Sequence, residues 1–293
     1  MTQIESVDEL LDLADPYDGY NRSLPASPFL PALLAACGVP AFSHGVYSVG
    51  PKFGATHHQV LRAAEIDVDA TPAQVAARLE NPAIGWGYVD QSRFCPKLFA
   101  LTELRRLMVK RPAITTTEVL AGAITGRKAT HLVTGFAHKP YPRIYALLAR
   151  HAGYASALLV RGTEGGIIPS LRQTGKIWHQ YQQDDEQEVD FKPESLGINQ
   201  ELRAVPLPED LPGYRKKNDG VASSVDAAAI AAAAARTGIE ALEGKAGATF
   251  DSLVYGATLC LWHLKRHRSL AEAARAVREV LESGKALEHF KAV

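Results

Sequence analysis

The chain has 293 residues, 46% of them hydrophobic, which is enough for one large domain or for a large and a small one. Its 32 basic and 32 acidic residues cancel, which argues against strong general nucleic-acid binding, although a local basic patch stays compatible with the composition. Three widely separated cysteines among apolar residues argue against a disulfide framework and favour buried thiols in the cytoplasm. No apolar run is long enough to cross a membrane.

The first part of the chain contains three helix signals and one strand signal. Residues 6–14 read as a helix capped by its first serine, with its three leucines on one side, and residues 30–36 read as a buried helix. Residues 39–42 read as a short apolar strand. A capping box at 71–74, with proline in the first helical position, predicts a helix over 72–80.

Residues 131–162 form the clearest unit of the sequence. Two continuous apolar segments, 131–136 and 156–161, flank a helix signal over 141–151. Strands without alternation are typical of a parallel sheet that is covered on both faces, so the unit predicts a right-handed β-α-β crossover. The helix is expected to turn three apolar residues toward the sheet, namely Ile144, Leu147 and Leu148.

The composition of the chain changes at about residue 180 and again at about residue 225. Residues 180–220 hold an acidic run, a basic run and several prolines and glycines, which indicate a long excursion with a hairpin as one option. Helices are then predicted over about 225–241, 249–265 and 269–283. Strands that alternate with helices predict an α/β fold.

A segment that begins directly after the predicted strand at 39–42 has the composition of an anion site. Small residues, a hydroxyl and a lysine placed between a strand and a helix let backbone N–H groups and the positive end of the helix face a ligand. An ordinary strand-to-helix loop explains the same composition. The residues concerned are His44, Gly45, Ser48, Lys52 and Gly54.

Three loops follow predicted strands and qualify for a ligand site, because ligands bind outside the carboxyl ends of the strands of an open α/β sheet. They span 43–45, 135–138 and 161–166, and the third is rich in glycine with one carboxylate, Glu164. His44 as a hydrogen-bonded loop residue and Glu164 as an exposed turn acid are the plain alternatives. His57 and His58 are expected to be solvated at the start of a helix.

The order of four segments resembles the anthranilate phosphoribosyltransferase family, which is glycosyltransferase family 3. HGVYSVGPKFG (44–54) resembles the family's KHGNRSVSSKSG-type segment, and RGTEGG (161–166) lies where the family has an HGEGG-type loop. FKPESLGI (191–198) and ESGKALEHF (282–290) resemble two later family segments. The resemblance covers about residues 15–293 and identifies a divergent branch.

The resemblance implies a two-domain fold of the nucleoside phosphorylase and phosphoribosyltransferase type. A small helical domain is expected from remnants at 1–37 and 92–128, and a large parallel-sheet α/β domain from 38–91 and 129–293. The family's first helices lack counterparts here, so the small domain is expected to be incomplete, with apolar surface that favours a homo-oligomer. Family members transfer the ribosyl group of phosphoribosyl pyrophosphate to an aromatic amine, with magnesium.

The resemblance also assigns roles to individual residues. It places the phosphate- and ribosyl-binding residues at His44, Gly45, Ser48, Lys52 and Gly54, and more faintly at Asp18 and Gly19. It implies acceptor contacts from His44, from Tyr47, and from Arg105 in a helix over 99–108. Glu164 is the one carboxylate in place to hold a metal.

Three departures separate the chain from the family pattern. Residues 16–21 replace the glycine-rich pyrophosphate loop, Val46 replaces an asparagine, and Ile-Ile-Pro-Ser at 167–170 replaces the Asp-Glu metal pair. Magnesium binding is therefore expected to be weakened, because departure of pyrophosphate needs preorganised charge stabilisation.

Three functions remain open at this level. The first is a phosphoribosyl-type transferase with an unidentified acceptor, acting on a phosphate-bearing small molecule. The second is a ligand- or nucleic-acid-binding relative without activity, since some members of this branch bind nucleic acid. The third is anthranilate phosphoribosyl transfer itself.

Overall fold

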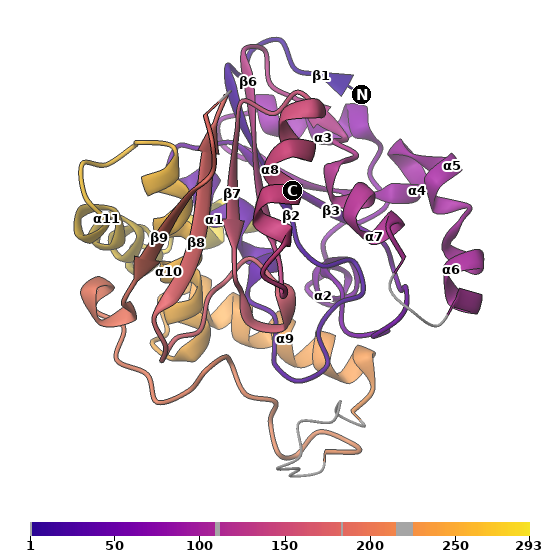
Figure 1. The fold of residues 1–293 in the computed structure, drawn as a ribbon. Helices are drawn as coiled ribbons and strands as arrows, with labels where there is room; N and C mark the ends of the chain where they lie inside the picture. Colours follow the sequence, from indigo (N-terminus) through magenta and orange to yellow (C-terminus); the bar gives the residue numbers. More distant parts are fainter. Residues whose placement is uncertain (1, 109–111, 183, 215–224) are drawn as a thin grey trace.

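A seven-stranded sheet in the order β4-β3-β2-β6-β7-β8-β9 runs through the protein in the computed structural model, which describes residues 2–108, 112–182, 184–214 and 225–293 (Figure 1). The first five strands in this order are parallel, and the last two are antiparallel. A separate parallel pair joins the chain near its start to the segment before β6. The strands are β1 (Thr2–Gln3), β2 (Glu9–Ala14), β3 (Ala41–Gly45), β4 (Trp86–Asp90), β5 (Ile124–Thr125), β6 (Ala129–Gly135), β7 (Ser156–Val160), β8 (Gly175–Tyr181) and β9 (Gln187–Phe191).

The order of the strands reverses between β2 and β6. The chain proceeds outward from β2 through β3 to β4, and then returns to β6 and proceeds the other way to β7. The connections on the two sides therefore leave the sheet in opposite directions, and a crevice opens between them at the carboxyl ends. These ends lie at the lower edge of the sheet in Figure 1, where the loops after β2, β6 and β7 meet.

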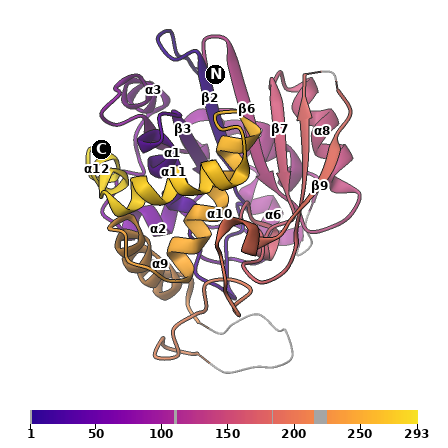
Figure 2. The same cartoon turned by 90° about the vertical axis from the view of Figure 1, so that its left-hand side faces the viewer.

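Helices cover both faces of the sheet, as continuous apolar strands require. One face packs against the buried helices α1 (Leu30–Ala36), α9 (Ala227–Leu242), α10 (Ala248–His263), α11 (Leu270–Glu282) and α12 (Lys285–Lys291), as Figure 2 shows. The other face packs against α3 (Pro72–Glu80) and α8 (Tyr141–His151). Helix α2 (His57–Ala63) lies against α9 and the end of β3.

Short helices project from one side of the molecule between β4 and β5 (Figure 1). They are α4 (Gln91–Phe94), α5 (Pro96–Phe99), α6 (Thr102–Met108), α7 (Ile114–Thr117) and the 3-10 helix η2 (Glu118–Leu120). Three further 3-10 turns are η1 (Ser27–Phe29), η3 (Thr163–Gly165) and η4 (Pro193–Leu196).

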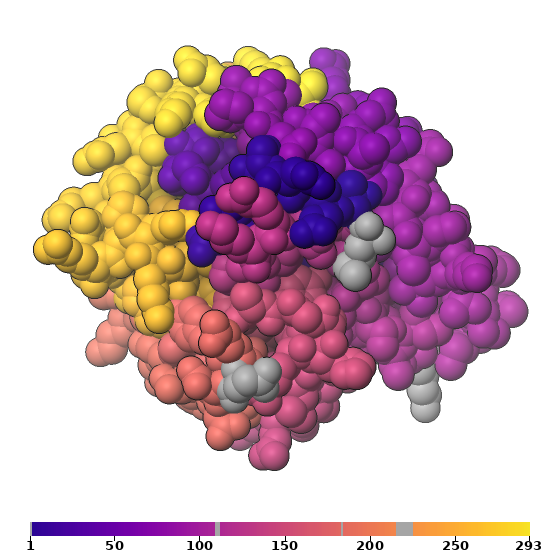
Figure 3. Space-filling model, turned by 90° about the horizontal axis from the view of Figure 1, so that it is seen from above, coloured from indigo at the N-terminus to yellow at the C-terminus, as the bar shows by residue number. Residues whose placement is uncertain are grey.

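The N-terminal segment lies at the edge at which the parallel strands begin. Figure 3 views this edge and shows the indigo N-terminal residues between purple and magenta parts of the chain. The backbone N–H groups of Glu5 and Ser6 donate to the carboxylate of Glu80 at the end of α3, and Ile4 is buried. The crevice at the strand reversal lies at the opposite edge.

The α/β fold and most predicted elements are confirmed. The unit at 131–162, the helix at 72–80 and the three C-terminal helices lie where the sequence predicts them. The hairpin that was one option for 180–220 is β8–β9, but its first strand begins earlier, at Gly175. No helix in the described part of the chain is long and apolar enough to cross a membrane.

The helix predicted over 6–14 is wrong, because residues 9–14 form the central strand β2. Leu11 and Leu13 pack into the core beneath α10, while Leu10 packs on the opposite face with α3. Leucines on both faces fit a strand between two helical layers, and a run this short has no period that separates the two structures. Since β2 pairs with β3 and β6, and α1 packs against α10 and α12, residues 9–36 belong to the α/β core rather than to a remnant of a helical domain.

The predicted inward face of α8 is also wrong. Ile144 and Leu147 are 40% and 51% exposed, whereas Tyr145, Ala146 and Ala149 are buried against the sheet. Helical spacing shows which residues share a face but not which face turns inward. The helix at 99–108 is divided in the structure into α5 and α6.

Candidate functional site

The crevice at the strand reversal holds a small pocket that is open to solvent. Its walls come from the loop after β2, the loop after β6, the segment 115–119 and the start of α8. The lining residues are Pro16, Tyr17, Asp18, Thr115, Thr116, Glu118, Val119, Thr134, Gly135, Phe136, Ala137, His138, Tyr141, Tyr145 and Gly165. Aromatic rings with a few polar groups are typical of sites for small organic ligands.

One of the two acidic residues that line this pocket is Glu118, which forms a buried ion pair with Arg105. Both side chains are almost fully buried, and Arg105 also lies 3.4 Å from the carbonyl oxygen of Gly50. Burial raises the pKa of Glu118 to about 7, although the charge and hydrogen bond of Arg105 oppose this rise. The carboxyl group therefore titrates near neutral pH rather than remaining charged throughout.

Beside the pocket, a cradle of backbone amides holds the carboxylate of Glu164. Its Oε2 atom accepts from the N–H of Asn21 at 3.1 Å, and its Oε1 atom accepts from the N–H of Arg22 at 3.1 Å. The hydroxyl of Ser23 donates to Oε1 at 2.7 Å. Consecutive backbone N–H groups that converge on one anion form the kind of concavity that binds phosphate or carboxylate.

Lys52 lies at the border of this cradle. Its Nζ atom donates to the backbone carbonyl of Glu164 at 3.1 Å and lies 3.4 Å from Oδ1 of Asp18. The same ammonium group lies 5.5 Å from the centre of the Tyr20 ring. Lys52 therefore connects the loop after β2, the loop before α2 and the loop after β7.

Gly19 and Gly54 hold two of these loops in direct backbone contact. The N–H of Gly54 donates to the carbonyl of Asp18, and Tyr20 and Ala55 form an isolated antiparallel bridge. A Cβ atom on Gly54 would lie 2.5 Å from the carbonyl oxygen of Tyr20, and Gly19 has a φ of +72°. Only glycine fits at both positions without moving the backbone.

His44 is the second-last residue of strand β3 and does not belong to the loop after the strand. Its Nε2 atom lies 3.1 Å from Oδ1 of Asp12, and its Nδ1 atom is hydrogen-bonded to the hydroxyl of Tyr17. The second oxygen of Asp12 accepts from Tyr154 at 2.7 Å. Because Tyr17 lines the pocket, this buried chain positions one wall of the crevice, and His44 itself is buried beneath that wall.

His57 is likewise buried, which corrects the expectation that it is solvated. Its Nε2 atom lies 2.8 Å from Oδ2 of Asp15, directly after β2. Burial alone would raise the pKa of Asp15, but hydrogen bonds from His57, Ser27 and Tyr20 hold it below its usual value. The pair therefore fixes the start of α2 against the end of β2.

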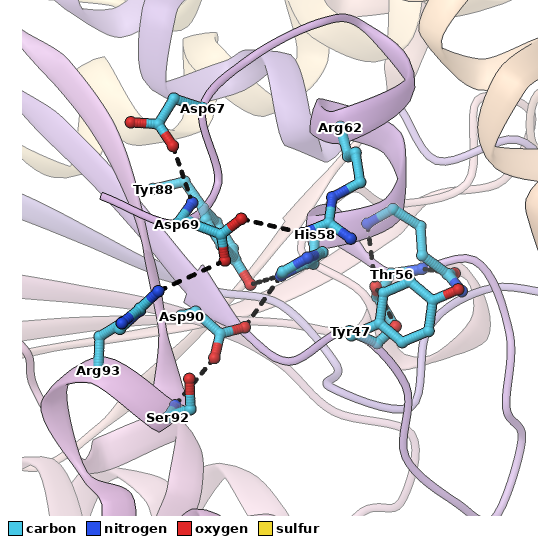
Figure 4. A network of polar contacts seen from close by, with 11 residues as sticks. Tyr47, Thr56, His58, Arg62, Asp67, Asp69, Tyr88, Asp90, Ser92 and Arg93 are labelled. Atoms are coloured by element: carbon cyan, nitrogen blue, oxygen red, sulfur yellow. Dashed lines mark hydrogen bonds and ion pairs between the residues drawn. The ribbon is translucent and has the colours of Figure 1, made fainter. Parts of the chain in front are cut away.

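His58 is buried too, and it belongs to a polar network at the ends of β3 and β4 (Figure 4). Its Nδ1 atom lies 2.9 Å from Oδ2 of Asp90. The other oxygen of Asp90 accepts from the N–H of Ser92 at 2.9 Å. The rings of Tyr47 and His58 are packed edge to face. The guanidinium carbon of Arg62 lies 5.9 Å from the centre of the Tyr47 ring. This network lies outside the pocket described above.

The structure brings some of the predicted site residues together and separates others. Asp18, Gly19, Lys52, Gly54 and Glu164 meet at the amide cradle. Gly45 is the buried last residue of β3, whereas Ser48 and Tyr47 are exposed. His44 and Arg105, two of the three predicted acceptor contacts, have side-chain nitrogen atoms next to the buried carboxylates of Asp12 and Glu118. Both carboxylate oxygens of Glu164 accept hydrogen bonds from backbone N–H groups. These donors surround the carboxylate as they would a bound anion, so its oxygens are not directed at a metal ion.

Sequence reasoning missed several residues of the site. Glu118 and Tyr17 approach the crevice from distant parts of the chain, and nothing in their local sequence marks them. Asn21, Arg22 and Ser23 contribute mainly backbone groups, which carry no sequence signature. Asp15 and Asp90 each stand at the end of a strand, and a systematic inspection of strand ends would have found them.

Residues 18–287 match the family described as "Glycosyl transferase family, a/b domain". The chain belongs to this family. The match extends from the loop after β2 to the C-terminal helix, so it includes the other six strands of the main sheet, most of the pocket lining and the cradle.

Curated relatives are similar at low identity. The anthranilate phosphoribosyltransferase of Aquifex aeolicus is 24% identical over 286 residues, which cover 97% of this chain and 76% of that protein. An uncharacterised protein of the same organism is 28% identical over 162 residues, which cover 55% of this chain and 46% of that protein. The enzyme of Chlamydia felis is 23% identical, with 87% and 66% covered. The chain thus spans about half to two thirds of the length of the latter two relatives.

Solved structures share the fold. Anthranilate phosphoribosyltransferase from Thermus thermophilus superposes with a TM-score of 0.66 at 18% identity, and the match covers 99% of this chain and 78% of that one. The enzyme of Saccharomyces cerevisiae in complex with PRPP and Mg gives 0.68 at 13% identity, with 99% and 73% covered. The predicted relationship to a divergent anthranilate phosphoribosyltransferase-like branch is confirmed by the family match and these relatives.

Proposed function

We propose that the chain binds phosphoribosyl pyrophosphate, or another sugar bearing phosphates, and acts as a phosphoribosyltransferase-type glycosyltransferase. The observation that carries this proposal is the amide cradle of residues 21–23 beside Lys52, which already holds a carboxylate. A phosphate presents the same acceptor oxygens with more charge, so it fits the same donors.

The pocket next to the cradle suits the rest of such a ligand and its acceptor. Gly165 and Asp18 belong to the pocket lining and adjoin Glu164 and Lys52 of the cradle. A ligand whose phosphates lie at the cradle therefore extends into the crevice at the strand reversal. Phe136, Tyr141 and Tyr145 provide aromatic surface there for a planar acceptor.

The acceptor differs from anthranilate in this proposal. The guanidinium of Arg105 is paired with Glu118 in the interior, so it is not available to an acceptor's carboxylate. Glu118 itself lines the pocket and, when ionised, disfavours a second negative charge there. We therefore expect a ring that carries hydrogen-bond donors and no carboxylate.

Magnesium binding depends on the ligand in this proposal. No group of three or more His, Cys, Asp or Glu side chains is placed to hold a metal ion in the described ranges 2–108, 112–182, 184–214 and 225–293. Magnesium is bound in many enzymes by one or two carboxylates together with substrate phosphates. Only that mode fits the carboxylates near the crevice, so no resident metal site is assigned.

A second candidate is binding without transfer. Ile167 and Ile168 occupy the place of the family's acidic pair and are buried in the apolar core. Replacement of charged groups by core residues removes a means of stabilising the leaving pyrophosphate. For this candidate the ligand is again phosphate-bearing, and the balanced charge of the chain disfavours nucleic acid.

Calorimetric titration with phosphoribosyl pyrophosphate, with and without magnesium, tests the proposal. We expect saturable binding of one ligand per chain that is weakened in Lys52→Ala. Transfer is tested with a panel of aromatic amines lacking carboxylates, by detecting pyrophosphate release. Binding with no release for any acceptor supports the second candidate, and absence of binding overturns both.

The proposal extends to the cellular compartment and to the assembly of the protein. We place the protein in the cytoplasm because three separated cysteines fit a reducing compartment. We also propose a homo-oligomer, because Leu104 and Leu107 on the projecting helix α6 are 52% and 67% exposed.

A further inference from the structure

Glu164 stands in an unusual backbone conformation while its side chain fills the amide cradle. Its φ angle is +54°, in the left-handed region that residues other than glycine rarely adopt. Glycines occupy positions 162, 165 and 166 around it. A non-glycine residue kept in this region among glycines points to a requirement for its side chain.

The surroundings of the loop restrict how Glu164 could leave the cradle. A Cβ atom on Gly162 would lie 1.8 Å from the carbonyl oxygen of Gly166, and one on Gly166 would lie 1.8 Å from the hydroxyl of Tyr20. The loop backbone is therefore closely packed at both of these glycines. The carboxylate itself is attached through rotatable side-chain bonds, so it can swing away while the backbone stays in place.

We propose that the cradle of residues 21–23 is a phosphate site that the chain's own Glu164 occupies in the absence of ligand. Ligand phosphate and the Glu164 carboxylate then compete for the same two N–H groups and the same hydroxyl. This inference rests on the proposed function, since it concerns the regulation of the same site. It adds that the site is self-inhibited.

The competition has a definite physical consequence. A tethered carboxylate is present at a high effective concentration, so the apparent affinity for phosphate is reduced by the fraction of molecules in which the cradle is filled. When phosphate displaces it, the freed carboxylate stays tethered near the incoming negative charge, while Lys52 contacts the backbone carbonyl of the same residue. Only a ligand with additional contacts in the crevice then binds tightly, which selects against free inorganic phosphates.

The experiment measures the affinity of inorganic pyrophosphate for the full chain by calorimetry. Glu164→Ala removes the competitor, Glu164→Gln keeps its shape without its charge, and Ser23→Ala removes one donor of the cradle. Glu209→Gln is the matched control, because Glu209 is exposed on a different loop. Circular dichroism melts establish that every variant is folded.

We expect Glu164→Ala to bind pyrophosphate at least about tenfold more tightly than the unchanged chain, with Glu164→Gln between them. Glu209→Gln should leave the affinity unchanged, and Ser23→Ala should lower it. Pyrophosphate should also shift the amide NMR signals of Asn21 and Arg22. A merely structural Glu164 would lower the melting temperature on substitution without raising the affinity.

Two other outcomes overturn different statements. Equal pyrophosphate affinity in the unchanged chain and in both folded Glu164 variants overturns the competition and leaves the phosphate site intact. Absence of pyrophosphate binding in every variant, with unshifted amides at Asn21 and Arg22, overturns the phosphate site and with it the proposed function.

Discussion

The imidazole of His57 lies 2.8 Å from the carboxylate of Asp15, and both side chains are buried. The carboxylate also accepts from Ser27, from Tyr20 and from the backbone N–H of Ile167 at 3.0 Å. One carboxylate thus joins the end of β2, the start of α2, the turn η1 and the segment after β7. These segments carry the loops that form the cradle and the crevice.

Replacement Asp15→Asn should destabilise the protein by about 3 kcal/mol or more, because it removes a buried carboxylate that accepts several hydrogen bonds and leaves donors mismatched. The pKa of Asp15 is lowered in the native state, so its contribution is present above its usual pKa of 3.8 and is lost as pH falls through the lower native value. Urea unfolding at neutral pH measures the loss.

The control for this measurement is Asp185→Asn, because Asp185 is exposed in the β8–β9 turn. It should change the free energy of unfolding by less than about 0.5 kcal/mol. Similar losses of unfolding free energy in the two variants would show that Asp15 contributes no more to stability than an exposed carboxylate does.

Replacement Lys52→Ala should weaken the binding of phosphoribosyl pyrophosphate by roughly 1–3 kcal/mol, the range of a charge-assisted hydrogen bond. Lys52 touches both Asp18 and the Glu164 carbonyl at the cradle, so its removal also loosens that junction. Calorimetric titration measures the affinity. Lys291→Ala on the C-terminal helix is the matched control, and unchanged affinity in Lys52→Ala would remove this lysine from the site.

The stability of the protein should depend on pH through Glu118. Its native pKa is about 7, whereas the usual value is 4.5, so between these values the native state holds a proton that the unfolded state has lost. Stability therefore falls as pH rises through this window, by an amount on the order of 3 kcal/mol.

Thermal melts at pH 5 and pH 8 test this dependence against the variant Glu118→Gln. The variant cannot titrate at this position, so its melting temperature should fall less between the two pH values. Parallel behaviour of the two proteins would show that Glu118 titrates near its usual pKa.

The chain should not form phosphoribosyl anthranilate at a useful rate. The pyrophosphate loop at 16–21, the asparagine position at Val46 and the acidic pair at 167–170 all depart from the family, and the guanidinium of Arg105 is buried against Glu118. Loss of one preorganised electrostatic element commonly costs about 10²–10³ in rate. The assay follows the decay of anthranilate fluorescence with phosphoribosyl pyrophosphate and magnesium. Turnover of about 1 s⁻¹ or faster would contradict the proposed acceptor.

The exposed leucines of α6 should mediate self-association. The double replacement of Leu104 and Leu107 by Glu places charge on the apolar surface of this projecting helix, so it should lower the mass measured by light scattering. The same change at the exposed Ile144 and Leu147 of α8 is the matched control. A monodisperse monomer of the unchanged chain would rule out the oligomer.

Much of the fold could be predicted from the sequence because the relevant signals are local. The unit at 131–162 has continuous apolar strands around a helix, and capping residues mark α3 and α11. These patterns determine that the fold is α/β and that ligands belong at the carboxyl ends of the strands. The strand at 9–14 was predicted as a helix, because a short run with leucines on both faces fits either a helix or a strand.

The candidate site could be predicted only in part. Lys52, Gly54 and Glu164 were found because glycine-rich loops with charged residues stand out along the chain, and the structure joins them at the cradle. His57 and His58 were expected in solvent, because their carboxylate partners lie 42 and 32 residues away in sequence. Burial of a histidine depends on such a partner, which local sequence does not reveal.

The sequence by itself determined the layers, the order of the loops and the residue types available to the crevice. Only the tertiary structure decided which charges remain available to a ligand. It pairs Arg105 with Glu118 in the interior and directs the carboxylate of Glu164 into backbone amides rather than toward a cation. The physical reason is that a charge is neutralised or presented according to its neighbours within a few ångströms, and here those neighbours come from distant segments brought together by the sheet.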